Sequence, residues 1–483
     1  MRDDQPYTPG GASVSDRPNI LILMTDEQNV HMSSVYGHPF VKTPNMQRLA
    51  DRGVVMDAAY CNSPTCVASR ASLMTSRYPS QIGVYDLSSM LSSEQPTWAH
   101  IFNAAGYETV LCGKMHFVGP DQRHGFTKRL VEDCHGDGMH HGVPNWDAIP
   151  RRGKTNITRI EQAGRAGRNS RHDYDCTVRD EAVRYLEEYA KGGSDKPFVL
   201  CASFIAPHFP LVVPEKYFNM YYPDHADLPM HPEPIDHPMY HRLRYVFGLD
   251  QHIDPDAVRR CRAAYYGLIT FVDELIGDVL DALERTRLAE NTFIIFTSDH
   301  GEMLGERGLW WKSALLDHSA RVPMIFSFPG RLPENERRSG VISNIDLAPT
   351  MCEIAGIPVP DFFEGQSAVA LLEGETGGWK DEALVEYLAH GAIHPQAALR
   401  KGRYKLIYSM HERSQLYDLE ADPYELRDLA HEARYAPVAR AMERELLGRW
   451  PAERIDREVR ESQRMRRILH AGLQKPDNDE PQN

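Results

Sequence analysis

The chain has 483 residues, a formal net charge of −14 at pH 7, 42% hydrophobic residues and 25% charged residues. This length exceeds that of one compact core, so we expect one large domain with a smaller one attached. The acidic balance excludes a general nucleic-acid binder, because affinity for phosphate backbones comes from clustered Lys and Arg.

The N-terminal segment and the apolar runs bear on where the chain works. Residues 1–18 are polar and rich in Gly, Pro and Asp, and they lack the apolar core of a signal peptide. The longest apolar runs, 19–25 and 291–298, have the length of strands and are too short to span a bilayer. Eight cysteines without a CxxC pair fit reduced thiols. We therefore expect a cytoplasmic protein with neither membrane nor nucleic acid as partner.

Apolar β-branched runs alternate with helical patterns along most of the chain. The expected strands are 19–26, 107–114, 197–207, 291–302 and 322–330. The expected helices are 43–53, 97–106, 175–193 and 261–287. This alternation predicts an α/β fold with a large, mostly parallel sheet flanked by helices. Such sheets carry their sites at the carboxyl ends of the strands.

Two irregular stretches and a change of pattern suggest the domain organisation. Residues 120–175 and 208–258 are long for loops and predict lids or substrate-binding insertions. After residue 376, short runs predict a small antiparallel sheet and helices. The predicted divisions are a flexible segment 1–18, a catalytic domain 19–376, a small α+β domain 377–460, and a helix with a polar tail 461–483.

Acidic side chains follow two of the strongest strands. Asp26 and Glu27 come at the end of one, and Asp299 and His300 come at the end of another. For either pair alone, ordinary strand-end polarity or helix capping is the commoner explanation. The two pairs together favour a divalent-metal site, and carboxylates with an imidazole suit calcium, magnesium or manganese.

A cationic set also lies at predicted strand exits and in a later loop. Lys114, His116, His208 and Lys312 each fit a solvated lysine or a satisfied histidine when taken singly. Together they predict a cradle for a tetrahedral oxyanion, with charge-assisted hydrogen bonds and proton transfer.

Cys66 opens a predicted helix, and Arg70 follows one turn later. A buried structural thiol is one interpretation. A thiolate nucleophile at the helix N-terminus is another, although a thiolate beside a hard metal is unusual.

The segment CVASRASLMTSRYP, residues 66–79, resembles the signature of type I sulfatases, C-x-[P/A]-S-R followed by L-x-T-x-R-x-P. Ala68 stands where the commoner motif has Pro. Further segments resemble landmarks of that family in the expected order: PNILILMTDEQ, VKTPNMQRLADRG, GKMHF, FTSDHGEMLGERGLWWK, HSARVPMI and LYDLEADPYELRDLA. The resemblance implies an alkaline-phosphatase-like α/β sandwich with a small C-terminal sheet domain.

The resemblance also implies how the site works. Cys66 would be oxidised to Cα-formylglycine by a formylglycine-generating enzyme, and a metal-bound hydroxyl of its hydrate would attack sulfur while Arg70 holds that oxygen. His208 and Lys312 would assist the leaving alcohol. His116 would deprotonate the second hydroxyl, so that sulfate leaves by elimination.

The same resemblance implies that Lys114 and Lys312 neutralise the sulfate oxygens. It further implies a Ca²⁺ site, with Mn²⁺ or Mg²⁺ as alternatives, whose ligands are Asp26, Glu27, modified Cys66, Asp299 and His300. Glu27 replaces the second Asp of many members, and His300 replaces their Asn.

Several motifs look like the choline-sulfatase-like subgroup, but the tail after Leu473 is shorter than theirs, so aryl and carbohydrate sulfates stay open as substrates. The alternatives are a phosphonate monoester hydrolase or phosphodiesterase, a non-catalytic binding protein in which Cys66 stays a thiol, and a cysteine-nucleophile hydrolase. By analogy we expect a homodimer or homotetramer.

Overall fold

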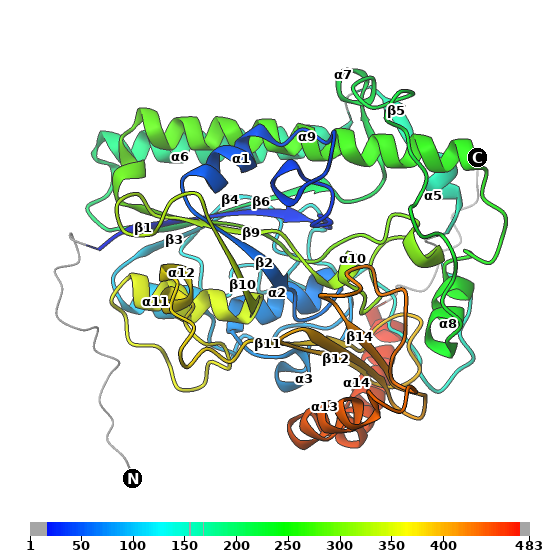
Figure 1. Cartoon of the computed structure of the whole chain (residues 1–483). Helices are drawn as coiled ribbons and strands as arrows, with labels where there is room; N and C mark the ends of the chain where they lie inside the picture. The colour runs from blue at the N-terminus through cyan, green and yellow to red at the C-terminus, as the bar shows by residue number, and fades with distance from the viewer. Residues whose placement is uncertain (1–16, 154–155, 168, 474–483) are drawn as a thin grey trace, which may run out of the picture.

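The computed structural model describes residues 17–153, 156–167 and 169–473. An eight-stranded sheet in the order β10-β2-β9-β8-β1-β6-β3-β4 crosses the molecule (Figure 1). Its strands are β1 (Asn19–Asp26), β2 (Val54–Tyr60), β3 (Glu108–Gly113), β4 (Lys128–Val131), β6 (Phe198–Pro207), β8 (Thr292–Ser298), β9 (Met324–Ser327) and β10 (Glu336–Ser343). Only β9 runs antiparallel to its neighbours in this sheet, so the predicted mostly parallel α/β fold is confirmed.

The centre of the sheet explains its continuous apolar runs. β1 lies between β6 and β8, and every residue of these three strands is buried. A strand covered on both faces gains burial at every position, which favours unbroken Ile, Leu, Val and Phe over alternation. Because β1 and β8 are parallel, with Thr25 opposite Ser298, the residues after them emerge at the same edge.

Helices cover both faces of this sheet (Figure 1). One face carries α1 (Pro44–Asp51), α6 (Ser170–Glu188) and the long α9 (Pro255–Arg285). The other carries α2 (Cys66–Thr75), α11 (Leu347–Ile354) and α12 (Val369–Glu373). α9 begins with Pro255 in its first turn, and the Asp254 carboxylate accepts a hydrogen bond from the amide of Asp256.

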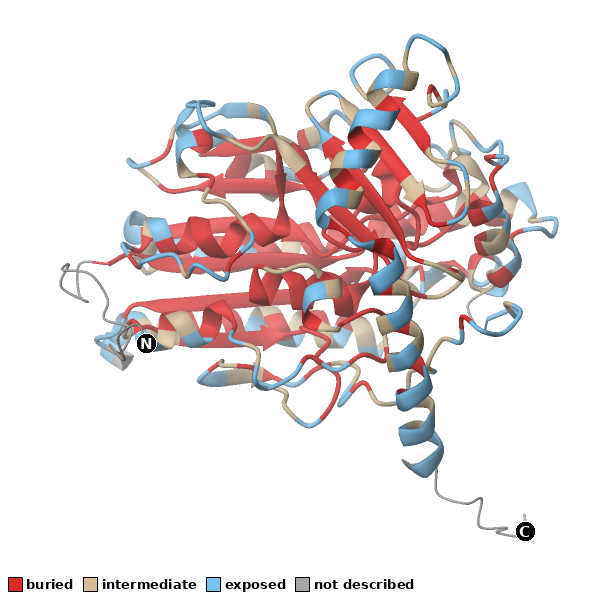
Figure 2. Ribbon diagram, turned by 90° about the horizontal axis from the view of Figure 1, so that it is seen from below, coloured by how far each residue is buried: buried red, intermediate tan, exposed pale blue. Residues whose placement is uncertain are grey.

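A four-stranded antiparallel sheet, order β11-β12-β13-β14, packs beside the large one. Its strands are β11 (Glu382–Tyr387), β12 (Gln396–Lys401), β13 (Tyr404–Ser409) and β14 (Gln415–Asp418), and α13 (Ala436–Arg449) and α14 (Ala452–Leu473) follow. Figure 2 shows α14 leaving the buried body, with its last turns exposed.

Buried polar contacts join the two sheets. Lys405 on β13 lies 2.8 Å from Asp317 and 2.7 Å from Glu425, and the Tyr60 hydroxyl donates to Asp317 at 3.1 Å. Lys405 is fully buried, so its charge depends on these two carboxylates.

The stretch 208–258, expected to be irregular, contains a regular helix, α8 (Pro238–Val246). The His237 ring accepts a hydrogen bond from the amide of Met239, and Pro238 occupies the first turn. Met239, Leu243 and Val246 are buried along one face of the helix. Because prolines and histidines lie in and around this short segment, its amphipathic pattern was not recognised in the sequence.

The remaining elements are short connections: α3 (Pro79–Ile82), α4 (Trp98–Ala104), α5 (Thr158–Glu161), β5 (Gly164–Ala166), β7 (Val212–Pro214), α7 (Glu215–Phe218) and α10 (Asp317–Ala320), with single turns of other helix types η2 (Ser34–Tyr36), η3 (Tyr189–Gly193), η4 (Leu288–Asn291), η5 (Glu306–Gly308) and η6 (Asn344–Asp346). Among the described residues, none of the helices combines the length and the apolar character that crossing a membrane requires.

Candidate active site

The ends of β1 and β8 bring two carboxylates and an imidazole together. Asp26 is the last residue of β1, and Asp299 and His300 follow β8 directly. The Asp299 Oδ1 atom accepts hydrogen bonds from the amides of Glu27 at 3.0 Å and of His300 at 2.9 Å. The side chains of Asp26, Glu27, Asp299 and His300 are fully buried. The hydrogen bond from Glu27 to Asp299 therefore joins the two strand ends inside the protein, away from solvent.

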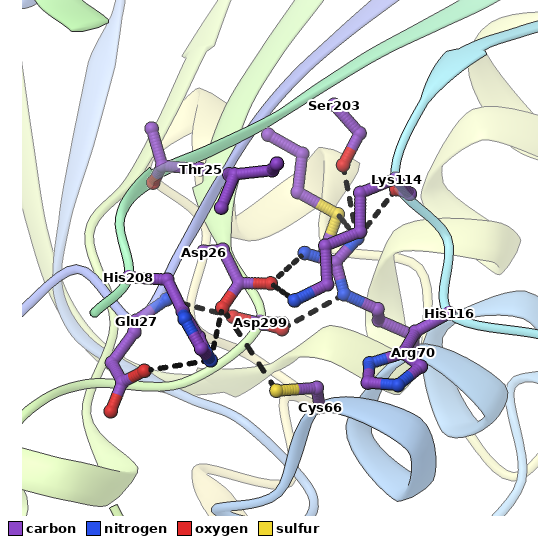
Figure 3. Close-up of polar contacts among 12 residues, drawn as sticks. Thr25, Asp26, Glu27, Cys66, Arg70, Lys114, His116, Ser203, His208 and Asp299 are labelled. Atoms are coloured by element: carbon purple, nitrogen blue, oxygen red, sulfur yellow. Dashed lines mark hydrogen bonds and ion pairs between the residues drawn. The ribbon is translucent and has the colours of Figure 1, made fainter. Parts of the chain in front are cut away.

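Cys66 enters this edge from the first turn of α2 (Figure 3). Its Sγ lies 3.1 Å from His300 Nε2 and 3.9 Å from Asp26 Oδ1. His300 Nδ1 lies 3.0 Å from the Gly301 carbonyl, which fixes the ring proton on Nδ1 and leaves Nε2 to accept from the thiol. Burial, together with Asp26, raises the pKa of the Cys66 thiol to about 12. The thiolate that a cysteine-nucleophile hydrolase needs is therefore disfavoured.

Arg70, one turn along α2, holds both carboxylates. Its Nε donates to Asp299 Oδ2 and its Nη2 to Asp26 Oδ2, each at 2.8 Å. Its Nη1 donates to the Lys114 carbonyl at 2.8 Å and to Ser203 Oγ at 2.9 Å. The guanidinium is thus fully used in positioning, with no nitrogen facing open solvent.

Lys114 follows β3 and places its Nζ 2.5 Å from Asp26 Oδ2. Burial by itself raises the pKa of the Asp26 carboxyl, but Lys114, His208 and Arg70 outweigh it and hold that pKa well below its usual range. Asp26 is therefore an anion at the centre of a cationic shell.

His208, Lys312 and Glu27 form a second contact set beside Asp26. Lys312 Nζ lies 2.9 Å from both Glu27 Oε2 and His208 Nε2. His208 Nδ1 lies 2.6 Å from the Phe209 carbonyl, so Nδ1 donates there and Nε2 accepts from Lys312. Burial raises the pKa of Glu27 to about 8, against the charge of Lys312.

His116 lies on the other side of Cys66 from His208 in the view of Figure 3. Its backbone has a φ of 59°, a left-handed conformation that non-glycine residues rarely adopt. Its Nε2 lies 3.1 Å from His141 Nε2. Burial, with the nearby charges of His135 and Lys114, keeps the pKa of His116 well below its ordinary value, so the ring is neutral.

The donor set fits a divalent cation. Ligand atoms of Asp26, Cys66, Asp299 and His300 lie within 4.8 Å of one another, and Glu27 forms a separate group with Asp26 and His208. Glu27 Oε1 is buried without a hydrogen-bond partner among the described residues. An unpaired buried oxygen destabilises the fold, and a cation bound to it would remove that destabilisation. Carboxylate oxygens with one imidazole suit Ca²⁺, Mg²⁺ or Mn²⁺.

The structure adds site residues that sequence reasoning missed. Ser203 binds Arg70 from the middle of β6, where nothing in the sequence marks it. Glu302 accepts from the amides of Leu304 at 2.8 Å and Trp311 at 2.5 Å, and its place two residues after His300 was the available signal. The Tyr265 hydroxyl donates to the Glu27 carbonyl at 2.6 Å, supporting that backbone from α9.

Comparisons with known proteins agree on one family. The model of the sulfatase family matches residues 18–357, and the model described as N-sulphoglucosamine sulphohydrolase, C-terminal, matches residues 305–450. The chain is 36% identical to a choline-sulfatase of Rhizobium meliloti, over 95% of this chain and 91% of that relative.

Two further proteins are similar over most of their length. An arylsulfatase of Clostridium perfringens is 30% identical, over 87% of this chain and 91% of that relative. The crystal structure of a phosphonate monoester hydrolase of Agrobacterium radiobacter matches with a TM-score of 0.73 and 27% identity, covering 89% of this chain and 95% of the other.

Proposed function

Because this chain belongs to the sulfatase family and is a sulfatase enzyme, we propose that it hydrolyses a small sulfate ester through a formylglycine made from Cys66 and a bound divalent cation. The observation that carries the proposal is the position of Cys66. It opens α2 with its sulfur 3.9 Å from Asp26 Oδ1 and 3.1 Å from His300 Nε2, among the side chains that could hold the cation.

Asp26, Asp299 and His300 would hold the cation, with Glu27 able to add an oxygen from the His208 side. We propose Ca²⁺, with Mn²⁺ or Mg²⁺ as alternatives. Once bound, the cation supplies Lewis acidity, and the hydrated aldehyde supplies the nucleophilic hydroxyl. Arg70 keeps both carboxylates oriented.

Sulfate binding falls to the two buried lysines. Lys114 pairs with Asp26 and Lys312 pairs with Glu27, and both lysine side chains are buried. Two ammonium groups in a water-poor site stabilise the charge on the sulfuryl oxygens far better than they would in water.

Two histidines divide the proton transfers. His208 Nε2 faces Lys312 Nζ at 2.9 Å, so a proton can reach the departing alcohol from this pair. His116 Nδ1 is buried and without a partner in the described part of the chain, so a neutral His116 accepts a proton there when sulfate leaves.

For the leaving group we propose a small-molecule alcohol: choline-like, aryl or carbohydrate. The support is the likeness to a choline-sulfatase and to an arylsulfatase. We further propose that residues 19–376 form the catalytic domain and 377–460 the smaller one, and that the protein acts in the cytoplasm as a homodimer or homotetramer.

A second candidate is hydrolysis of phosphonate monoesters or phosphodiesters. The likeness to the Agrobacterium hydrolase favours keeping it. Comparing kcat/KM for sulfate esters with kcat/KM for phosphonate and phosphodiester substrates of the same leaving group decides between the two.

The first test is the mass of the tryptic peptide that carries Cys66, from protein co-expressed with a formylglycine-generating enzyme. Conversion of the thiol to the aldehyde lowers the mass by about 18 Da, and hydration restores one water. A Cys66→Ala variant is the matched control and loses both the mass change and turnover. An unmodified thiol under these conditions favours a non-catalytic binding protein instead.

A further inference from the structure

A second cluster of ligand atoms lies beside the proposed active site. Nitrogen atoms of His116, His135 and His141 lie within 4.8 Å of one another. His116 Nε2 lies 3.1 Å from His141 Nε2. The His135 ring stacks on His116 with centroids 4.0 Å apart, so its side chain must rotate to direct a nitrogen at an ion that it shares with His116. His135 and His141 come from the loop after β4, which folds back over the residues that follow β3.

One buried carboxylate builds this arrangement. Asp133 Oδ2 accepts hydrogen bonds from the amides of Met115 at 2.8 Å and His116 at 2.7 Å. Asp133 Oδ1 accepts from the amide of His135 at 3.0 Å. The two segments are therefore locked together through their backbones, and the left-handed φ of His116 turns its ring toward the loop.

We propose that His116, His135 and His141 form a second metal site, distinct from the carboxylate site, that takes one Zn²⁺ ion. Two nitrogens bound at 2.0–2.1 Å on a tetrahedral ion lie about 3.3 Å apart, close to the observed separation of the two Nε2 atoms. Three imidazoles with a fourth position open to water are an established zinc donor set.

The protonation state of the cluster suits metal binding. Burial lowers the pKa of His135 to about 2 and that of His141 to about 4, with further lowering from Lys114 and from neighbouring imidazoles. The rings are therefore neutral, which is the ligand form. His135 Nε2 has no hydrogen-bond partner within the described ranges, so metal binding breaks no hydrogen bond at that atom. At the other two rings an ion would take the place of the 3.1 Å contact between His116 Nε2 and His141 Nε2.

The two sites differ in the metals they prefer. The first offers carboxylates and suits hard cations, whereas the second offers only imidazole and suits zinc, nickel or copper. The charge of Lys114 acts on all three histidines, but Asp26 pairs with Lys114 at 2.5 Å and reduces its repulsion of a bound cation. A protein saturated with Ca²⁺ therefore still has a place for Zn²⁺.

Zinc at this site would stop turnover. It occupies the lone pair of one His116 nitrogen and raises the acidity of the ring, so His116 no longer accepts a proton. This consequence rests on the role proposed above for His116, whereas the binding of the ion does not.

The test uses Ca²⁺-saturated full-length protein and measures binding separately from activity. Co²⁺ serves as the spectroscopic probe, and Zn²⁺ is counted by elemental analysis after dialysis. We expect one equivalent in addition to calcium, with the intense visible bands of tetrahedral Co²⁺. The variants His135→Gln and His141→Gln should each bind at least about tenfold more weakly.

His140→Gln is the matched control. His140 belongs to the same loop, and its ring lies 4.2 Å from that of His141, but it is outside the three-nitrogen cluster. We expect it to keep the additional equivalent. The proposed site is wrong if the His135 and His141 variants keep the additional equivalent of metal, or if the protein without substitutions lacks it. Binding without inhibition supports the site and contradicts only the role of His116 in turnover.

Discussion

Glu386 offers a test of how burial alone affects stability. It lies on β11, fully buried, and accepts hydrogen bonds from the Ser80 amide and hydroxyl, each at 2.8 Å, and from Trp450 Nε1 at 3.0 Å. These donors come from α3 and from the residue that follows α13, so one carboxylate joins three segments. Among the residues that the structure describes, no cation pairs with it, and burial raises its pKa from 4.5 to about 7.

The direction of the pH effect follows from this raised pKa. The folded chain keeps the Glu386 proton up to about pH 7, whereas the unfolded chain releases it near pH 4.5. The free energy of unfolding therefore falls as pH rises between these two values, and stays at the lower level above them. The difference between these two pKa values corresponds to a change of at most roughly 3 kcal/mol in the free energy of unfolding.

The change is Glu386→Gln, which removes the titration and keeps the shape. The amide NH₂ of Gln cannot accept a hydrogen bond, so one of the three donors loses its acceptor. This lowers the free energy of unfolding by about 1–3 kcal/mol at every pH. Relative to the unmodified chain, however, it should gain roughly 2–3 kcal/mol between about pH 5 and about pH 8.

Urea unfolding followed by fluorescence at several pH values measures this difference. Glu420→Gln, at an exposed carboxylate 3.4 Å from Arg403, is the control for the loss of a carboxyl charge at the surface. A Glu386→Gln offset that does not change with pH would refute the reasoning, because it would mean that the buried carboxyl ionises as easily as an exposed one.

Three further perturbations have expected outcomes. Arg70→Lys removes the guanidinium that spans Asp26 and Asp299. Because Lys114 still pairs with Asp26, the carboxylate that loses its buried cation is Asp299, and the free energy of unfolding should fall by about 3–5 kcal/mol, measured by urea unfolding; a loss below about 1 kcal/mol contradicts it. Lys405→Met removes the buried cation that pairs with Asp317 and Glu425 between the two sheets. We expect a similar loss in the free energy of unfolding, with kcat of the protein that still folds retained. Chelation with EGTA should lower the melting temperature and abolish turnover, and Ca²⁺ should restore both; full activity after verified metal removal would exclude a metal at the Asp26 edge.

The parts of the site that lie at strand ends were predictable from the sequence. Asp26 and Asp299 each follow an unbroken apolar run, and two such runs pair as neighbouring parallel strands whose ends meet. Cys66 and Arg70 were recognisable as one short motif. In each case the chemistry lies within a few residues of a strongly patterned element, so local sequence determines position.

The rest depends on contacts between distant segments. The sequence did not show that Glu27 faces Lys312 and His208 rather than joining the group around His300, because that choice depends on its left-handed backbone and on Tyr265 from α9. His141 reaches His116 only because Asp133 anchors the connecting loop, and loop geometry of that kind leaves no periodic signal.

The burial of Cys66 also sets a time limit on the conversion to formylglycine proposed above. In the folded chain its side chain is 1% exposed, with the sulfur against His300, so an enzyme has no access to it. Among the groups that enclose it, His300 comes directly after β8, more than two hundred residues later in the chain. At about 5–20 residues per second, synthesis leaves Cys66 uncovered for roughly 12–47 s. The proposed conversion would have to be completed in that interval or before β8 docks. The fraction of active enzyme would then depend on a competition between oxidation and folding, and slower translation should raise that fraction.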